Sequence, residues 1–77
     1  MSTKYNGHKN WNHWNVSLWI NNDEGLYSMA REAIRRAGSR EAAASQMQLY
    51  LMTSGNGVTP DGARYTKTAI RAAMVGM

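Results

Sequence analysis

Apolar residues recur at helical spacing in four stretches of the chain, separated by short segments rich in Asn, Ser and Gly. The first stretch predicts a helix over residues 11–21, capped by Asn10 or Asn12. A strand over residues 16–20 is the alternative, but the capping Asn and the helical spacing favour a helix. Trp11, Trp14 and Leu18 recur at helical spacing, and Val16, Trp19 and Ile20 widen the apolar surface, so the helix is expected to be buried centrally.

A second helix is predicted directly after the first, because Asn22 or Asp23 can cap a new start. The neighbouring acidic residues Asp23 and Glu24 suit the positive end of a helix dipole. Gly38 is a typical residue just beyond a helix end, so the helix is expected to stop before it. The apolar stripe of this helix comprises Leu26, Ala30, Ala33 and Ala37, with Tyr27 and Ile34 beside it.

The second half of the chain predicts two further helices. Ser39 caps the third, which ends in the Gly-rich segment 54–57. Its predicted inner face comprises Ala43, Met47, Tyr50 and Leu51, and its solvated side includes Gln46 and Gln48. The turn segment Thr59–Gly62 precedes the fourth helix, which runs from Tyr65 or Thr66 to Val75. The apolar side of the fourth helix comprises Ala69, Ile70, Ala73 and Met74.

Together these elements predict an all-α fold, a compact bundle of about four short helices in a single domain over residues 1–77. Residues 1–9 are polar and are expected to form a loosely ordered lead-in. The chain has no Cys, which excludes disulfides and thiolate metal sites. It has three Trp and no Phe, so Trp is expected to be the main bulky filler of the core.

The formal net charge of +4 favours anionic partners, among them nucleic acid and acidic protein surfaces. The cations form one stripe on the predicted fourth helix, at i, i+3 and i+7, and another on the second. Adjacent stripes would make one cationic surface for phosphates or carboxylates, whereas the commoner alternative is a solvated helix face. The candidate partner-binding residues are Arg31, Arg35, Arg36, Arg64, Lys67 and Arg71, with Arg40 nearby and Trp11 as an aromatic anchor.

The three Trp side chains could stack on nucleic-acid bases, where each stacked base contributes about 1–3 kcal/mol. Their helical spacing and aliphatic neighbours favour a place in the core instead. One helix cannot aim all three in the same direction, so Trp11, the nearest to the lead-in, is expected to be partly exposed. An exposed aromatic side chain suits a protein interface as well as a base.

We expect a protein that is not an enzyme and that holds no cofactor and no metal. Each carboxylate has an ordinary structural explanation: a helix start, a turn or, for Glu32, an i,i+4 pair with Arg36. The segment Gly55–Gly57 lacks the preceding strand and the following Lys of a phosphate loop. His8 and His13 are expected to face solvent or to cap rather than to bind a metal.

No membrane location is expected. No segment approaches the roughly 20 apolar residues that span a bilayer, and the start of the chain lacks the apolar run of a secretory signal. The absence of Cys is compatible with a reducing cytoplasm.

Two parts of the sequence resemble a family of short proteins, without assigned activity, encoded by bacteriophages and other mobile elements. The main part is a Trp-rich signature within residues 4–27, and the weaker part is Thr59–Gly62 with Tyr65. The runs that carry the signature are Lys4–Gly7, Asn10–Trp11, Trp14–Ile20 and Asn22–Tyr27. His13 departs from the family, which often has an acidic residue or Thr there, so no role is carried over to that position.

The resemblance implies a phage-encoded accessory protein in the host bacterial cytoplasm. In size and lack of catalytic groups the chain is similar to anti-defence proteins, including anti-CRISPR inhibitors. The first hypothesis is an inhibitor or modulator that sterically occludes a bacterial host protein, such as a nucleic-acid-handling complex. The second is a small basic DNA- or RNA-binding module. A helix–turn–helix is disfavoured because the Gly38–Ser39 link is shorter than the usual turn. The sequence sets no oligomeric state.

Overall fold

The computed structural model describes residues 10–55 and 57–77. This part of the chain forms four helices: α1 (Trp11–Asn22), α2 (Glu24–Ala37), α3 (Arg40–Ser54) and α4 (Lys67–Ala73). The only β-type pairing within it is an isolated antiparallel bridge between Val58 and Arg64. The predicted all-α bundle is confirmed, whereas the expected lead-in over residues 1–9, which includes His8, lies outside the described residues.

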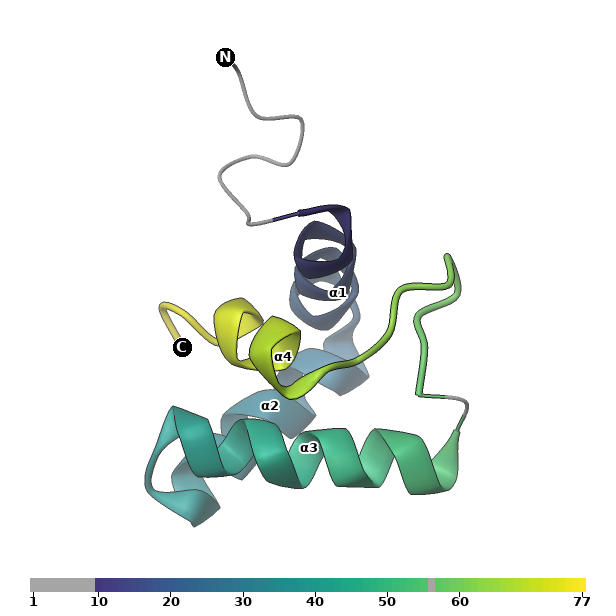
Figure 1. Cartoon of the computed structure of the whole chain (residues 1–77). Helices are drawn as coiled ribbons and strands as arrows, with labels where there is room; N and C mark the ends of the chain where they lie inside the picture. The colour runs from purple at the N-terminus through teal and green to yellow at the C-terminus, as the bar shows by residue number, and fades with distance from the viewer. Residues whose placement is uncertain (1–9, 56) are drawn as a thin grey trace.

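The four helices form a ring in which each packs against two others (Figure 1). Helix α1 contacts α2 and α4, and α3 contacts the same two helices from the other side. Among the described residues, the diagonal pairs α1–α3 and α2–α4 have no Cα atoms within 8 Å of each other. The core lies between the helices and consists of one large aromatic side chain, Tyr65, and otherwise of small or medium ones. Its residues are Val16, Ile20, Ala30, Ala43, Ala44, Met47, Ala63, Tyr65, Ala69, Ile70, Ala73 and Met74.

Local hydrogen bonds fix where each helix begins. In all four helices a side-chain oxygen accepts from the backbone N–H three residues later, which satisfies a donor that the helix itself leaves free. The capping residues are Asn10, Asp23, Ser39 and Thr66. Between the alternatives that the sequence left open, Asn10 caps α1 rather than Asn12, and Asp23 caps α2 rather than Asn22. Gly38 ends α2 with a φ of 81°, as its position predicted.

The expectation that Trp fills the core is wrong. Trp11 is 40% exposed, as expected, but Trp14 and Trp19 are only half-buried, and none of the three belongs to the core. Helix α1 instead turns Val16 and Ile20 inward, and both are fully buried. An indole carries a polar N–H as well as a large apolar body, so it fits the boundary of a small core better than its centre.

Two other predicted inner residues lie outside. Leu18 of α1 is on the exposed side of the helix, and Tyr50 of α3 is 53% exposed. On α3, Ala44 is buried instead of Tyr50, and its small side chain lets the helix approach its neighbours closely. Gln46 is exposed as expected, whereas Gln48 is half-buried.

Helix α4 is shorter than its apolar pattern predicted. It starts at Lys67 because Thr66 caps it, and it ends at Ala73. Tyr65 precedes the helix and is buried, with 6% of its surface exposed. The predicted apolar side is nevertheless confirmed, since Ala69, Ile70, Ala73 and Met74 all lie in the core.

The loop between α3 and α4 is held against α1 by polar side chains. Asn15, which is buried, donates from Nδ2 to Oδ2 of Asp61 at 2.9 Å and accepts at Oδ1 from Oγ1 of Thr59 at 2.6 Å. Trp19 Nε1 donates to the same Asp61 oxygen at 3.0 Å. Side chains far apart in the sequence therefore anchor one turn to one helix.

A second anchor lies one turn earlier on α1. The side-chain amide of Asn12 donates to the carbonyl oxygen of Arg64 at 3.0 Å, and its Oδ1 accepts from the N–H of Arg64 at 2.9 Å. Asn12 thus pairs with the backbone as a neighbouring strand would. This contact leaves Arg64 in the loop before α4, with its side chain exposed.

Candidate partner-binding surface

The outer face of α2 carries three cations and one carboxylate. Glu32 accepts from Arg35 at 2.6 Å and from Arg36 at 2.9 Å; the two Arg side chains are largely exposed and Glu32 is half-buried. Hydrogen bonds from Arg35 and then Arg36 hold the pKa of Glu32 below its ordinary value. Because this single carboxylate is shared by two guanidinium groups, the face as a whole keeps an excess of positive charge.

Arg31, one turn away on the same helix, is held differently. Its guanidinium lies 5.8 Å from the centre of the Tyr27 ring, in cation–π contact, and Nη1 donates to the Tyr27 hydroxyl at a long 3.4 Å. Within residues 10–55 and 57–77 it forms no ion pair. An aromatic face orients a guanidinium without neutralising it, so Arg31 keeps its full charge for a ligand.

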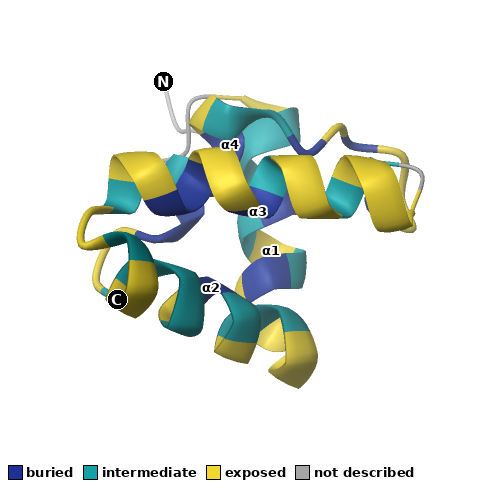
Figure 2. Ribbon diagram, turned by 90° about the horizontal axis from the view of Figure 1, so that it is seen from below, coloured by how far each residue is buried: buried dark blue, intermediate teal, exposed yellow. Residues whose placement is uncertain are grey.

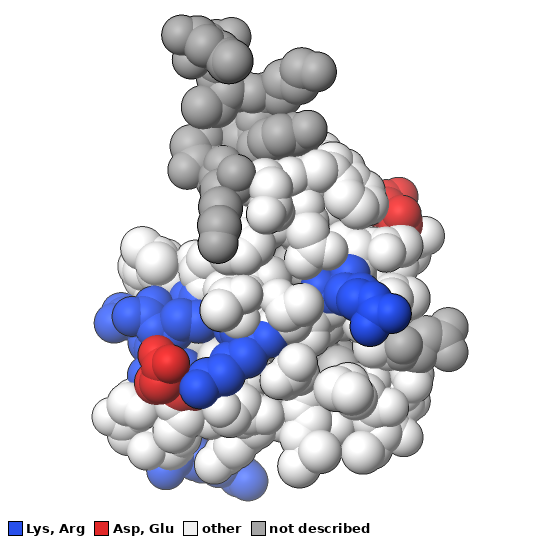
Figure 3. All heavy atoms as spheres, in the orientation of Figure 1, with Lys and Arg blue, Asp and Glu red and all other residues white. Residues whose placement is uncertain are grey.

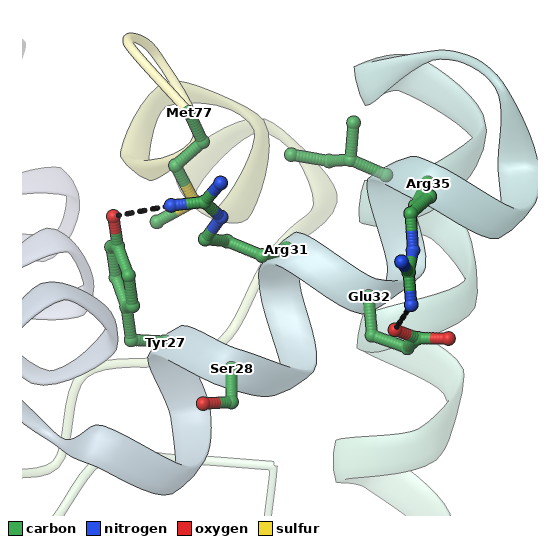
Figure 4. A pocket seen from close by; sticks show the side chains of 7 residues that line it. Tyr27, Ser28, Arg31, Glu32, Arg35 and Met77 are labelled. Carbon is green, nitrogen blue, oxygen red and sulfur yellow. Dashed lines mark hydrogen bonds and ion pairs between the residues drawn. The ribbon is translucent and has the colours of Figure 1, made fainter.

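A groove of about 550 Å³ runs beside these residues. Figure 4 shows Arg31 reaching toward Tyr27 and Met77 along one wall, while Arg35 points to Glu32 on the other. The lining mixes hydroxyl, charged and apolar groups: Tyr27, Ser28, Arg31, Glu32, Ile34, Arg35 and Met77. Such a groove can bind a carboxylate through Arg31 and cover the adjoining apolar atoms with Ile34 and Met77.

The cations of α4 form a separate group over α3. Lys67 Nζ lies 3.3 Å from Glu41, and Arg71 Nε lies 3.6 Å from the same carboxylate. These two ion pairs join α4 to α3. Figure 3 shows one face of the molecule, with a red group bordered by blue ones and a further blue group that lies apart from them. Glu41 of the neighbouring helix therefore offsets one of the two positive charges on α4, and one remains in excess.

The remaining cations, Arg40 and Arg64, do not join the cations of α2 either. Arg40 donates to the main-chain oxygens of Met74 and Met77, at 3.0 and 3.3 Å, and so ties the start of α3 to the segment after α4. Arg64 lies before α4 rather than on it, since Asn12 holds its backbone in the loop. The structure thus unites Arg31, Arg35 and Arg36 on α2 but does not join them to the α4 residues.

The carboxylates of Asp23 and Asp61 act as structural acceptors. Asp23 caps α2 by accepting from the N–H of Leu26 at 2.9 Å. Hydrogen bonds from Asn15 and then Trp19 hold the pKa of Asp61 below its ordinary value. In the part of the chain that the structure describes, no three His, Asp or Glu residues gather closely enough to hold a metal ion. Nor does any of its helices combine the length and apolar character that crossing a bilayer requires.

Sequence reasoning missed two parts of this surface. Tyr27 was placed beside the apolar stripe of α2, although its i,i+4 spacing from Arg31 could have signalled a cation–π pair. The approach of Met77 to α2 had no local signal, because it depends on how the chain turns after α4. Trp11 is exposed as predicted, but it lies on α1, outside the α2 groove.

The two segments that carry the family resemblance contact each other. Asn15 and Trp19 from the Trp-rich segment bind Asp61 of the Thr59–Gly62 turn. A family model spans residues 1–77, and the chain belongs to the family of unknown function DUF7249. No curated protein and no solved structure matches the chain. The geometry gives these two segments a structural role, which is to fix the α3–α4 loop on α1.

Proposed function

We propose that this member of DUF7249 is a non-enzymatic protein that binds an acidic surface of a partner protein through the α2 groove. The observation that carries the proposal is Arg31, a guanidinium that Tyr27 orients along one wall of the groove and that pairs with no carboxylate among the described residues. Arg and Tyr are among the residue types that most often dominate protein interfaces. A carboxylate on the partner would complete the charge balance.

The non-enzymatic part of the proposal is supported by what the polar side chains already do. Asp61 and Asn15 bind within the fold, and Glu32 and Glu41 bind Arg and Lys side chains. A catalytic site requires acidic, basic or nucleophilic groups that converge on one place and remain available to a substrate. Here the polar groups that lie close together form hydrogen bonds or ion pairs with one another. Arg31 and Arg35 at the α2 groove are suited to binding.

The proposed setting is the one that the sequence resemblance implies: a phage-encoded inhibitor or modulator in the host bacterial cytoplasm. The partner would be a bacterial protein complex, such as a nucleic-acid-handling complex of a defence system of the kind that anti-CRISPR proteins inhibit. A small rigid bundle would act there by occupying a functional surface. Proteins that handle nucleic acid are themselves basic where nucleic acid binds, so an acidic target surface would lie elsewhere on such a complex.

Direct binding of DNA or RNA is the alternative, and the charge arrangement disfavours it. Binding through phosphates needs a cationic path that follows the backbone. In this chain Lys67 and Arg71 share the carboxylate of Glu41 and lie on α4, which has no Cα atom within 8 Å of one in α2. The α2 cations alone cover a short stretch of one helix.

The test is affinity purification from a bacterial host lysate with the tagged chain and two charge-reversal variants. One variant is Arg31→Glu with Arg35→Glu in the groove, and the matched control is Lys67→Glu with Arg71→Glu, which changes the net charge equally. We expect a stoichiometric protein to be recovered with the wild type and the control, to be lost with the groove variant, and to survive nuclease treatment. Equal recovery with both variants, or loss on nuclease treatment, would contradict the proposal.

A further inference from the structure

The outer face of α3 carries large exposed apolar side chains and no charge beyond its first turn. Leu49, Tyr50 and Met52 are 66%, 53% and 58% exposed, and all three fall within a single helical turn. No charged residue occurs from Ala42 to Ser54. Exposed residues recur along the whole of α3 in Figure 2. Scattered exposed apolar residues are ordinary, but a contiguous group of large ones marks an interaction site.

The outermost residues of α3 follow a regular spacing. Ala42, Ser45, Leu49 and Met52 are all exposed and are separated by three, four and three positions. They lie on the side of the helix opposite the buried Met47. Three-four-three spacing is the pattern by which two helices pack along a coiled-coil interface.

The order of residue sizes in this row fits a second copy of the same helix. The two small residues, Ala42 and Ser45, come first, and the two large ones, Leu49 and Met52, come last. In an antiparallel pair with a two-fold axis at the level of Met47, Ser45 of each copy faces Leu49 of the other, and Ala42 faces Met52. Large side chains then meet small ones along the whole contact, which permits close packing. A parallel pair would instead set large against large.

Ser45 is the one polar member of this row, and its hydroxyl does not prevent the contact. A serine within a helix can donate to the carbonyl oxygen of the preceding turn, so it needs no polar partner on the opposite copy. It is also uncharged and nearly as small as alanine. Ser45 therefore fits opposite a large apolar side chain at little desolvation cost.

The charge distribution selects the same face. Two copies of a chain with a net charge of +4 repel each other, so they associate best where neither presents a charge. Helices α2 and α4 carry most of the described cations, whereas α3 has no charged residue after Glu41. Antiparallel helices also place opposite ends of their dipoles together.

We propose that α3 is a homodimer interface in which two copies of this chain pack their α3 helices antiparallel along Ala42, Ser45, Leu49 and Met52. The inference rests on α3 alone and does not depend on the groove of α2. The repulsion between copies is electrostatic and the contact is not, so added salt strengthens the dimer. A contact made of ion pairs would weaken with salt.

The first test is sedimentation velocity of the full chain over a range of protein and salt concentrations. We expect a species of twice the chain's mass that gains population with salt. Leu49→Glu should weaken the dimer by at least about tenfold, as expected for a central interface residue. Val75→Glu is the matched control, because Val75 is 71% exposed but lies beyond α4, and it should leave the dimer intact. A monomer under all conditions, a dimer insensitive to Leu49→Glu, or one that weakens with salt would overturn the proposal.

The second test fixes the direction of packing. The chain has no Cys, so any disulfide that forms must join the single cysteines introduced at the interface. An equimolar mixture of Ser45→Cys and Leu49→Cys chains should form a disulfide between unlike copies faster than either variant forms one with itself. Val75→Cys should not crosslink under the same mild oxidation. Faster self-crosslinking of Leu49→Cys than of the mixture would overturn the antiparallel arrangement.

Discussion

Oγ1 of Thr59 donates a hydrogen bond of 2.6 Å to Oδ1 of Asn15, across 44 positions of sequence. Both residues are buried, with 2% and 1% of their surfaces exposed. The Thr59 hydroxyl also accepts from the N–H of Ala63 at 3.0 Å, and the Asn15 amide donates to Asp61. One helix residue therefore orders a whole turn, and no buried polar side-chain atom among the described residues lacks a partner.

Removing the Asn15 side chain should therefore destabilise the fold without disturbing α1 as a helix. Asn15→Ala leaves the hydroxyl of Thr59 without its acceptor in a buried place, so we expect a loss of about 1–3 kcal/mol in the free energy of unfolding. Urea unfolding followed by circular dichroism measures the loss. Gln46→Ala, at an exposed position of α3, is the control and should change the free energy by less than about 0.5 kcal/mol.

Thr59→Val should cost a similar amount, about 1–3 kcal/mol, because it keeps the shape but removes the hydroxyl. The two substitutions break the same hydrogen bond, so the double variant Asn15→Ala with Thr59→Val should lose less than the sum of the single losses. Strict additivity in the urea experiments would show that the two side chains do not act as a unit.

The orientation of α1 predicts a contrast between two of its aliphatic residues. Ile20 is fully buried and Leu18 is exposed, although the apolar pattern placed Leu18 inside. Ile20→Ala should cost about 2–5 kcal/mol, since it opens a cavity in the core. Leu18→Ala should cost about 1 kcal/mol or less. Equal losses in thermal or urea unfolding would mean that α1 faces the core differently.

Acid should weaken the attachment of the α3–α4 loop. Hydrogen bonds from Asn15 and Trp19 lower the pKa of Asp61 in the folded chain, so the folded chain binds this proton less readily than the unfolded chain does. The carboxylate therefore stabilises the fold above its ordinary pKa of about 3.9, and that contribution is lost as pH falls through the lower folded value. Glu32 acts in the same direction.

Asp61→Asn isolates this contribution, because an amide does not titrate in this range. The melting temperature of the variant should fall less steeply with acid than that of the wild type. Identical slopes for the two proteins would show that Asp61 is not the group responsible.

Tyr65 should ionise at a higher pH than an ordinary tyrosine. Burial, and then the nearby negative charge of Asp23, raise the pKa of its hydroxyl above the ordinary value of about 10. A raised folded pKa means that the stabilisation is complete below that ordinary value and is lost as pH rises through the folded value. Alkaline titration of phenolate absorbance should show a late component that Tyr65→Phe removes. A wild type that titrates in a single step would contradict this assignment.

The end of α2 depends on the backbone conformation of Gly38, whose φ is 81°. Nothing lies within 4 Å of a Cβ built there, so Gly38→Ala is opposed by backbone strain alone and should cost about 1–2 kcal/mol. Gly25 lies inside α2, where the same change should stabilise by up to about 1 kcal/mol. Urea unfolding of the two variants should give opposite signs; a stabilised Gly38→Ala would refute the strained C-cap.

The sequence by itself determined the elements of this protein. Asn10, Asp23, Ser39 and Gly38 mark helix boundaries through contacts that span three or four residues, and such contacts form wherever those residues occur in the same local pattern. The apolar side of α4 was also predictable, because only one side of that helix carries apolar residues. The net positive charge and the row of charge-free residues on α3 are likewise properties of the sequence.

Only the tertiary structure decided which side of each helix packs into the core and which side forms the surface. Helix α1 is apolar on nearly every side, so its periodicity cannot choose between Leu18 and Ile20, and the choice falls to packing against α2 and α4. The bonds of Asn15 and Trp19 to Asp61 join residues more than forty positions apart, and no local pattern encodes them. The same is true of the separation between the cations of α2 and α4. Local contacts fix helices, whereas surfaces depend on how those helices meet.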